Sequence, residues 1–128
     1  LHQIKQHQIP MPDTGSVHED SRAIVRDLYK SLNETSLGRA LAGLLAERQS
    51  DPKLSVAIDA LWDSRQRMVD DVIRRGIGSG QIRSDIAEST ITDLLAAPAY
   101  YRLLVSGQPL DSKSADRHAD ALVAALTT

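Results

Sequence analysis

The stretch that decides the fold is Ala97-Pro98-Ala99-Tyr100-Tyr101-Arg102-Leu103-Leu104-Val105-Ser106-Gly107-Gln108-Pro109-Leu110-Asp111. Its apolar residues follow helical spacing, Pro98 lies inside the run and is expected to kink it, and Gly107 and Pro109 end it. Arg102 is the exception among almost uniformly apolar positions. A helix that is apolar on every side must be covered on every side. In a chain this short, we expect the second cover to be another copy of the protein.

Composition limits both the architecture and the partners. The chain has 128 residues, no cysteine, no phenylalanine and 3% aromatic residues. One domain packed from Leu, Ile, Val and Ala is therefore expected, which favours close-packed helices, and the absence of cysteine excludes disulfides and thiolate metal sites. The formal net charge is −2. Because a DNA-binding domain normally carries a basic excess, any DNA binding by the intact protein is expected to lie outside these residues.

Helical periodicity and capping residues predict an all-α domain of five helices, and no β-type alternation is found. Ser16 with Glu19 forms a capping box, Asp51 precedes Pro52 as an N-cap, and Asp111 begins the last helix. The fourth helix is expected to begin at Asp85. The predicted helices run from 16 to about 32, from 37 to about 50, from 52 to about 76, from 85 to 105 and from 111 to 126.

The last two predicted helices form half of a four-helix bundle, which two-fold pairing with a second copy would complete. A helix hairpin buried within a monomer is the alternative. Leu122→Glu is expected to separate the dimer. The candidate interface residues are Ile91, Leu95, Pro98, Arg102, Ala119, Leu122 and Leu126.

Four segments, taken in order, resemble the C-terminal regulatory domain of TetR-type transcriptional repressors. They are the entry loop Pro12-Asp13-Thr14-Gly15-Ser16, the middle helix pair from Leu41 to Asp51 followed by Pro52, the glycine-rich turn from Arg74 to Asp85, and the stretch from Ala97 to Asp111. The resemblance implies an effector-binding and dimerisation domain over residues 13–128. Residues 1–12 would then be the tail of a connector helix and a linker from an absent N-terminal helix-turn-helix domain.

The same resemblance implies the partners and the mechanism. The chain would form a homodimer, bind an unknown small and mostly apolar effector, and reach DNA only through the N-terminal domain. A cytoplasmic ligand-responsive regulator, most simply a repressor, is expected. The competing class is a dimeric helical scaffold or interaction module with no small ligand.

A candidate effector site combines residues of several helices. Trp62, Arg65 and Met68 share one face of the long helix, because they are spaced by three. Since neighbouring helical residues point about 100° apart, Tyr100 and Tyr101 cannot face the same pocket. The alternative is that Trp62 and Met68 fill the core and that the two tyrosines pack at the dimer seam. The full set of candidates is Leu28, Leu32, Leu45, Trp62, Arg65, Met68, Tyr100 and Tyr101.

Enzyme chemistry finds no support in the sequence, and we expect no cofactor and no metal site. No nucleophile elbow or phosphate-binding glycine loop is present. Asp70 and Asp71 precede Arg74 and Arg75 by one turn, which is typical of a salt-bridged surface. Arg102 is expected to pair across the dimer or to orient an acidic ligand.

Overall fold

The computed structural model of the chain describes residues 13–34 and 36–127, and these contain helices and turns but no strand. The helices are α2 (Val17–Glu34), α3 (Ser36–Glu47), α4 (Pro52–Gly78), α5 (Glu88–Tyr101), the π-helical turn η1 (Arg102–Ser106) and α6 (Ser112–Leu126). The all-α prediction is confirmed. The predicted connector helix and linker over residues 1–12 lie outside the described residues.

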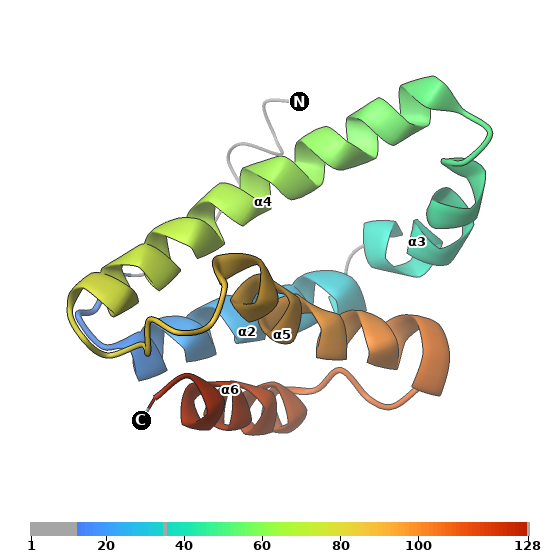
Figure 1. The fold of residues 1–128 in the computed structure, drawn as a ribbon. Helices are drawn as coiled ribbons and strands as arrows, with labels where there is room; N and C mark the ends of the chain where they lie inside the picture. Colours follow the sequence, from blue (N-terminus) through green and yellow to red (C-terminus); the bar gives the residue numbers. More distant parts are fainter. Residues whose placement is uncertain (1–12, 35, 128) are drawn as a thin grey trace.

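The helices form two unequal parts (Figure 1). α2, α5 and α6 pack side by side, and the C-terminal end of α4 lies beside the start of α2. α3 and the first turns of α4 stand away from α5. The main core is shared by α2, α5 and α6 and the end of α4. Its most enclosed side chains are Val25, Tyr29, Ile91 and Leu126.

Local capping chemistry sets the helix starts. The Asp51 carboxylate accepts the N–H groups of Lys53 and Leu54 at 3.1 and 3.2 Å, with Pro52 as the first helical residue. The Asp111 carboxylate accepts the Ser114 N–H at 2.7 Å, and this bond lowers the pKa of Asp111. Such bonds satisfy N–H groups that have no partner inside the helix. Both predicted starts are confirmed.

α5 begins three residues later than predicted, so the Asp85 start is wrong. The Asp85 carboxylate makes a two-pronged contact with the Arg83 guanidinium at 2.7 and 2.7 Å, which lowers the pKa of Asp85. Ala87 precedes the helix without a side-chain cap. The Arg83 pair therefore occupies the carboxylate that was expected to cap the helix.

α5 also ends differently from the single helix predicted to reach Val105. After Tyr101 the chain widens into a π-helical turn, in which the Gly107 N–H donates to the Arg102 carbonyl at 2.9 Å. Gly107 then adopts a φ of +68°, a conformation that glycine adopts without a side-chain clash. The predicted stop at Gly107 is confirmed.

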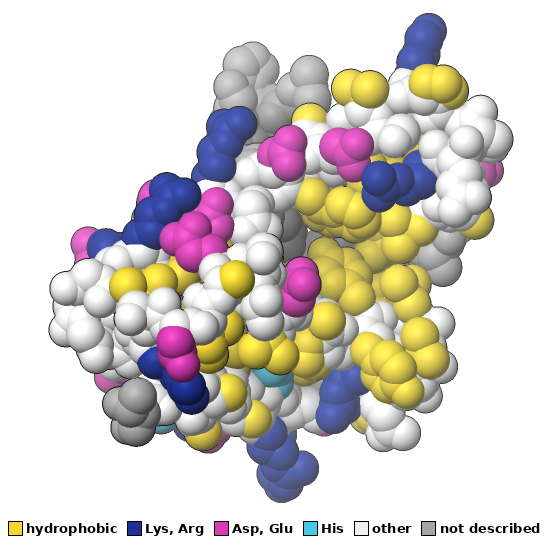
Figure 2. All heavy atoms as spheres, in the orientation of Figure 1, with side chains coloured by type: hydrophobic (Ala, Val, Ile, Leu, Met, Phe, Trp, Pro, Cys, Tyr) yellow, Lys and Arg dark blue, Asp and Glu magenta, His cyan; other side chains and the backbone are white. Residues whose placement is uncertain are grey.

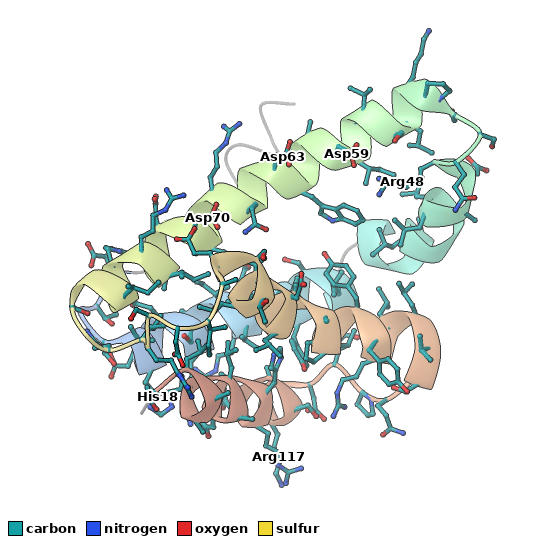
Figure 3. The ribbon with its side chains drawn as sticks, in the orientation of Figure 1. His18, Arg48, Asp59, Asp63, Asp70 and Arg117 are labelled. Carbon is teal, nitrogen blue, oxygen red and sulfur yellow. The ribbon has the colours of Figure 1, made fainter. Side chains whose placement is uncertain are left out.

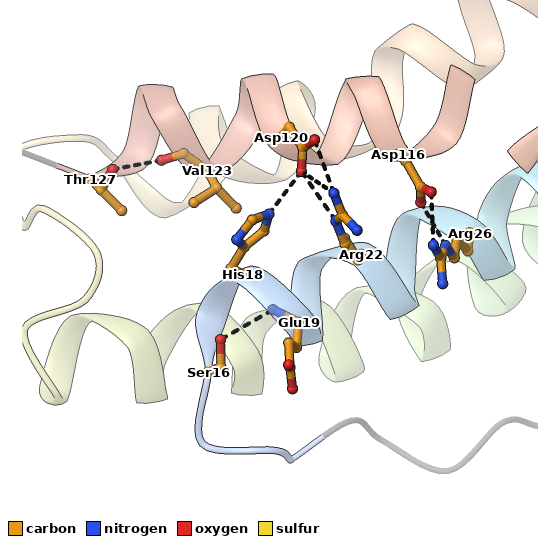
Figure 4. A network of polar contacts seen from close by, with 9 residues as sticks. All are labelled: Ser16, His18, Glu19, Arg22, Arg26, Asp116, Asp120, Val123 and Thr127. Atoms are coloured by element: carbon orange, nitrogen blue, oxygen red, sulfur yellow. Dashed lines mark hydrogen bonds and ion pairs between the residues drawn. The ribbon is translucent and has the colours of Figure 1, made fainter. Parts of the chain in front are cut away.

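Polar contacts along the surface hold α2 to α6 (Figure 4). The Asp120 carboxylate contacts His18 at 2.8 Å and Arg22 at 2.9 Å, and Asp116 contacts Arg26 at 2.6 Å. These partners lower the pKa of Asp120 and of Asp116. We call these five residues the α2–α6 ladder. Exposed pairs of this kind are screened by solvent and add little to stability, so the ladder serves mainly to align α2 with α6.

Candidate functional site

An aromatic cluster lies where three helical segments meet. The Trp62 ring, from the middle of α4, meets the Tyr100 ring of α5 edge to face, with centroids 6.3 Å apart and planes at 82°. The Arg48 guanidinium, just after α3, lies 5.4 Å from the Trp62 ring centroid. We call Arg48, Trp62 and Tyr100 the aromatic cluster. The aromatic cluster therefore connects α3 and α4 to the main core.

The aromatic cluster touches the apolar core through Tyr100. Leu45 and Tyr100 are half-buried and pack against the core, to which Leu28 and Leu32 of α2 belong. Figure 2 shows hydrophobic side chains gathered between the two parts of the molecule on the face in view.

Arg48 supplies the charge at this site. Its guanidinium donates to the Asp59 carboxylate at 3.0 Å, and the two side chains lie between the end of α3 and α4 (Figure 3). The Asp59 side chain is 53% exposed, so this pair is a weak surface contact that an incoming anion can replace. The cation–π contact with Trp62 is also worth only about 0.5–1 kcal/mol at a partly exposed position. Both contacts of the Arg48 guanidinium are therefore weak and partly exposed to solvent.

Arg48 was not among the predicted site residues. It lies 14 positions before Trp62 in the sequence, and only the reversal of the chain at Ser50 and Asp51 brings the two together. The sequence signal that could have identified this contact is the pair of predicted helices on either side of that turn.

The predicted effector-site residues do not all come together. Leu28, Leu32, Leu45 and Tyr100 lie in or beside the same core, and Trp62 contacts Tyr100. Tyr101 is 59% exposed and lies on another face of α5, away from the aromatic cluster. This separation follows from the 100° turn between successive helical residues. The side chains of Arg65 and Met68 lie outside the described residues.

The face of α5 that carries Tyr101 forms an open groove of about 580 Å³. Leu94 is 43% exposed, Leu104 39% and Val105 69% on α5 and η1. Arg102 lines this groove, and its guanidinium donates to the Pro109 carbonyl at 3.1 Å. We call this surface the outer groove. It is lined by Thr90, Asp93, Leu94, Ala97, Pro98, Tyr101, Arg102, Ser106 and Gln108.

Most of the predicted interface residues are buried within the single protomer. Five of the seven candidates are enclosed by their own chain, and only Pro98 and Arg102 line the outer groove. Helical periodicity identifies a buried stripe but not what buries it. The enclosed residues are Ile91 at 0% exposure, Leu95 at 5%, Ala119 at 0%, Leu122 at 4% and Leu126 at 2%.

A polar contact beneath the outer groove was not predicted. The His118 Nε2 lies 3.0 Å from the Leu94 carbonyl, and its Nδ1 lies 3.2 Å from the Tyr29 hydroxyl. Since a carbonyl only accepts, the neutral ring carries its proton on Nε2 and accepts the Tyr29 O–H at Nδ1. Burial lowers the pKa of His118 and raises that of Tyr29.

Pro98 explains why His118 is needed there. Leu94 lies four residues before Pro98, and proline has no N–H to donate to that carbonyl. The His118 imidazole on α6 supplies the missing donor. Tyr29, which holds the other ring nitrogen, continues the spacing of Val25 and Leu32 on α2, and that spacing was the signal for its burial.

Comparison with known proteins gives one consistent family. Residues 11–122 match the family model described as "Tetracyclin repressor-like, C-terminal domain". The HTH-type transcriptional regulator AqdR of Rhodococcus erythropolis is 32% identical over 79 residues, which are 62% of this chain and 38% of that protein. The uncharacterized HTH-type transcriptional regulator YdeS of Bacillus subtilis (strain 168) is 27% identical over 105 residues, 81% of this chain and 52% of that protein.

A solved structure agrees with these matches. The crystal structure of the TetR family transcription regulator SCO0332 aligns with a TM-score of 0.83 and 27% identity, over 99% of this chain and 70% of that one. The chain thus spans 38% and 52% of the two curated relatives it matches. None of the helices within the described ranges is both long and apolar enough to cross a membrane.

Proposed function

This chain belongs to the tetracyclin repressor-like C-terminal domain family, and from that premise we propose that it is the effector-binding and dimerisation domain of a ligand-responsive transcriptional regulator. The relatives it matches are helix-turn-helix regulators longer than this chain. We infer that the DNA-binding head precedes the described residues and that the regulator works as a repressor in the cytoplasm. The net charge of −2 supports a domain that does not itself hold DNA.

The aromatic cluster is the observation that carries the effector proposal. Trp62 and Tyr100 provide two ring surfaces, and Arg48 provides a cation bound by contacts that a ligand can replace. We infer that the effector is small and mostly apolar, with a flat ring system against Trp62 and an acidic group at Arg48. Its binding would shift α4 relative to α5, because each helix contributes one of the two rings. A shift releases DNA only if the effector binds the two arrangements with different affinity.

The outer groove supports the dimer. Leu94, Tyr101, Leu104 and Val105 leave an apolar face uncovered in a single copy, which is the condition under which a second copy gains stability by covering it. Two-fold pairing would place the same face of α5 on both sides of the interface. We infer that α5, with the exposed face of α6, forms the dimer contact.

The experiment compares the full-length protein with the 128-residue chain. Genomic fragments retained by the full-length protein are sequenced to identify its site, and binding is measured against salt concentration. The full-length protein is expected to hold one duplex with a strong salt dependence, and the 128-residue chain is expected to hold none. A compound that quenches Trp62 fluorescence is then expected to weaken that complex. Salt-sensitive DNA binding by the 128-residue chain contradicts the proposal, as does a full-length protein with no DNA site.

A further inference from the structure

The segment through which the chain enters this domain is held by the far end of α4. Gln81, in the turn after α4, accepts the Val17 N–H at 2.8 Å and donates to the Gly15 carbonyl at 3.1 Å. Arg75, in the last turns of α4, pairs with the Asp13 carboxylate at 2.7 Å. We call Asp13, Gly15, Val17, Arg75 and Gln81 the entry clamp.

Close backbone packing makes the entry clamp stiff. A Cβ atom on Gly76 would lie 2.8 Å from the Val17 Cγ2 atom, so α4 and the start of α2 meet there without room for a side chain. The Gly76 carbonyl accepts the N–H groups of Gln81 and Ile82, both at 2.9 Å. The turn that carries Gln81 is therefore folded back on the end of α4 and moves with it.

The entry segment itself has a fixed shape. The Asp20 carboxylate is buried at 5% exposure and accepts both the N–H and the hydroxyl of Thr14, at 3.0 and 2.8 Å. Gly15 adopts a φ of +86°, which lets the chain turn into α2. These contacts hold residues 14 to 20 in one conformation. A displacement of the entry clamp therefore changes the direction of the chain at Asp13.

α4 and α6 hold different parts of α2. The α2–α6 ladder holds the exposed face of α2 through His18, Arg22 and Arg26. The end of α4 packs on α2 through the apolar core, and its polar contacts, with those of the turn after it, fall on residues 13 to 17. A movement of the end of α4 therefore reaches the entry segment directly. Trp62 and Arg75 lie on the same uninterrupted helix, separated by about 20 Å at 1.5 Å per residue.

We propose that the entry clamp transmits displacements of α4 at Trp62 to whatever segment precedes Asp13, with Gln81 and Arg75 as its positioning residues. The inference rests on the proposed function, in which that segment leads to the DNA-binding head. An effector at the aromatic cluster would then re-aim the head through α4 and the entry clamp. The α2–α6 ladder would provide the fixed reference.

The test uses the 128-residue chain and needs neither an effector nor DNA, so its failure leaves the proposed function standing. Trp62→Ala perturbs α4, and backbone amide exchange is measured by NMR at Thr14 and Asp20. Residues this far apart normally act independently. Transmission through α4 is expected to change these exchange rates by about two- to thirtyfold, the range of couplings carried through packed networks. With Gln81→Ala in the background, Trp62→Ala is expected to have no effect there.

The matched control is Arg26→Gln, which removes a contact of α2 with α6 instead of α4. In that background the effect of Trp62→Ala is expected to persist. Trp62→Leu and Arg75→Gln replace the first pair of variants if either one unfolds. The proposal is overturned if Trp62→Ala leaves the exchange rates of both amides unchanged. It is also overturned if Trp62→Ala has the same effect in the Gln81→Ala background as in the wild type.

Discussion

Tyr101→Glu is expected to separate the dimer, and the structure sets the size of the effect. Tyr101 is 59% exposed in one copy. A tyrosine buries about 150–250 Å² when fully covered, so about 120 Å² remains to be covered by a partner. At about 25 cal/mol per Å², that area is worth about 3 kcal/mol in each copy. In a two-fold dimer both copies bury this side chain, so the free energy is gained twice.

The measurable quantity is the dimer dissociation constant. If the partner covers only half of this area, the loss is still about 3 kcal/mol in total, which raises the constant by about a hundredfold. The introduced carboxylate adds to the loss, because it would be buried without a partner. Sedimentation velocity over a series of concentrations follows the change directly.

Val56→Glu is the matched control. Val56 is also an exposed apolar residue, at 70% exposure, but it lies in the first turns of α4, which stand away from α5. It is expected to leave the dissociation constant unchanged. A wild-type chain that sediments as a monomer would refute the reasoning, and so would a Tyr101→Glu variant that dimerises normally or a Val56→Glu variant that is equally weakened.

Three further predictions concern residues packed within the single chain. Leu122→Glu is expected to unfold the chain instead of dissociating it, with a loss of more than about 3 kcal/mol seen in circular dichroism melts, because Leu122 is enclosed by its own protomer. His118 has a lowered pKa, so its contribution to stability is complete above pH of about 6.5 and declines below it. Urea unfolding from pH 7.5 to pH 5 is expected to show a steeper loss in wild type than in His118→Gln, by up to about 1.4 kcal/mol per pH unit, and equal slopes would contradict the assignment. Gly76→Ala is expected to cost about 1–3 kcal/mol of unfolding free energy, because the added methyl group clashes with the Ile82 and Val17 side chains. Gly43→Ala, with open space around it, is expected to stabilise the chain by about 0.5–1 kcal/mol.

The helices were predictable where a short stretch of sequence contains both the signal and its target. Asp51 and Asp111 cap N–H groups two or three residues away, so their chemistry is complete within one turn. Asp85 has the same local form, but Arg83 competes for the carboxylate from two residues away. The start of α5 was wrong because the Asp85 carboxylate has two local partners, the Arg83 guanidinium and the N–H groups of the next turn. Sequence spacing does not say which of the two it binds.

The site was less predictable, because it depends on which faces meet. The apolar stripe of Leu95 and Leu122 was assigned to a second copy, yet the protomer itself uses that stripe for its core. Arg48 reaches Trp62 only after the chain reverses between α3 and α4. Periodicity gives the direction of a side chain around its own helix axis, but it does not identify the helix on the other side.

α5 connects the two proposed surfaces directly. Tyr100 meets Trp62 in the aromatic cluster, and the next residue, Tyr101, lines the outer groove. Because Pro98 leaves the Leu94 carbonyl to His118, this part of α5 is tied to α6 as well as to its own preceding turn. An effector that displaces Tyr100 therefore moves Tyr101 with it, since a helix cannot turn one residue without its neighbour. In the proposed regulator, effector binding and dimer stability must then be linked, and reciprocity requires that each change the other by the same factor.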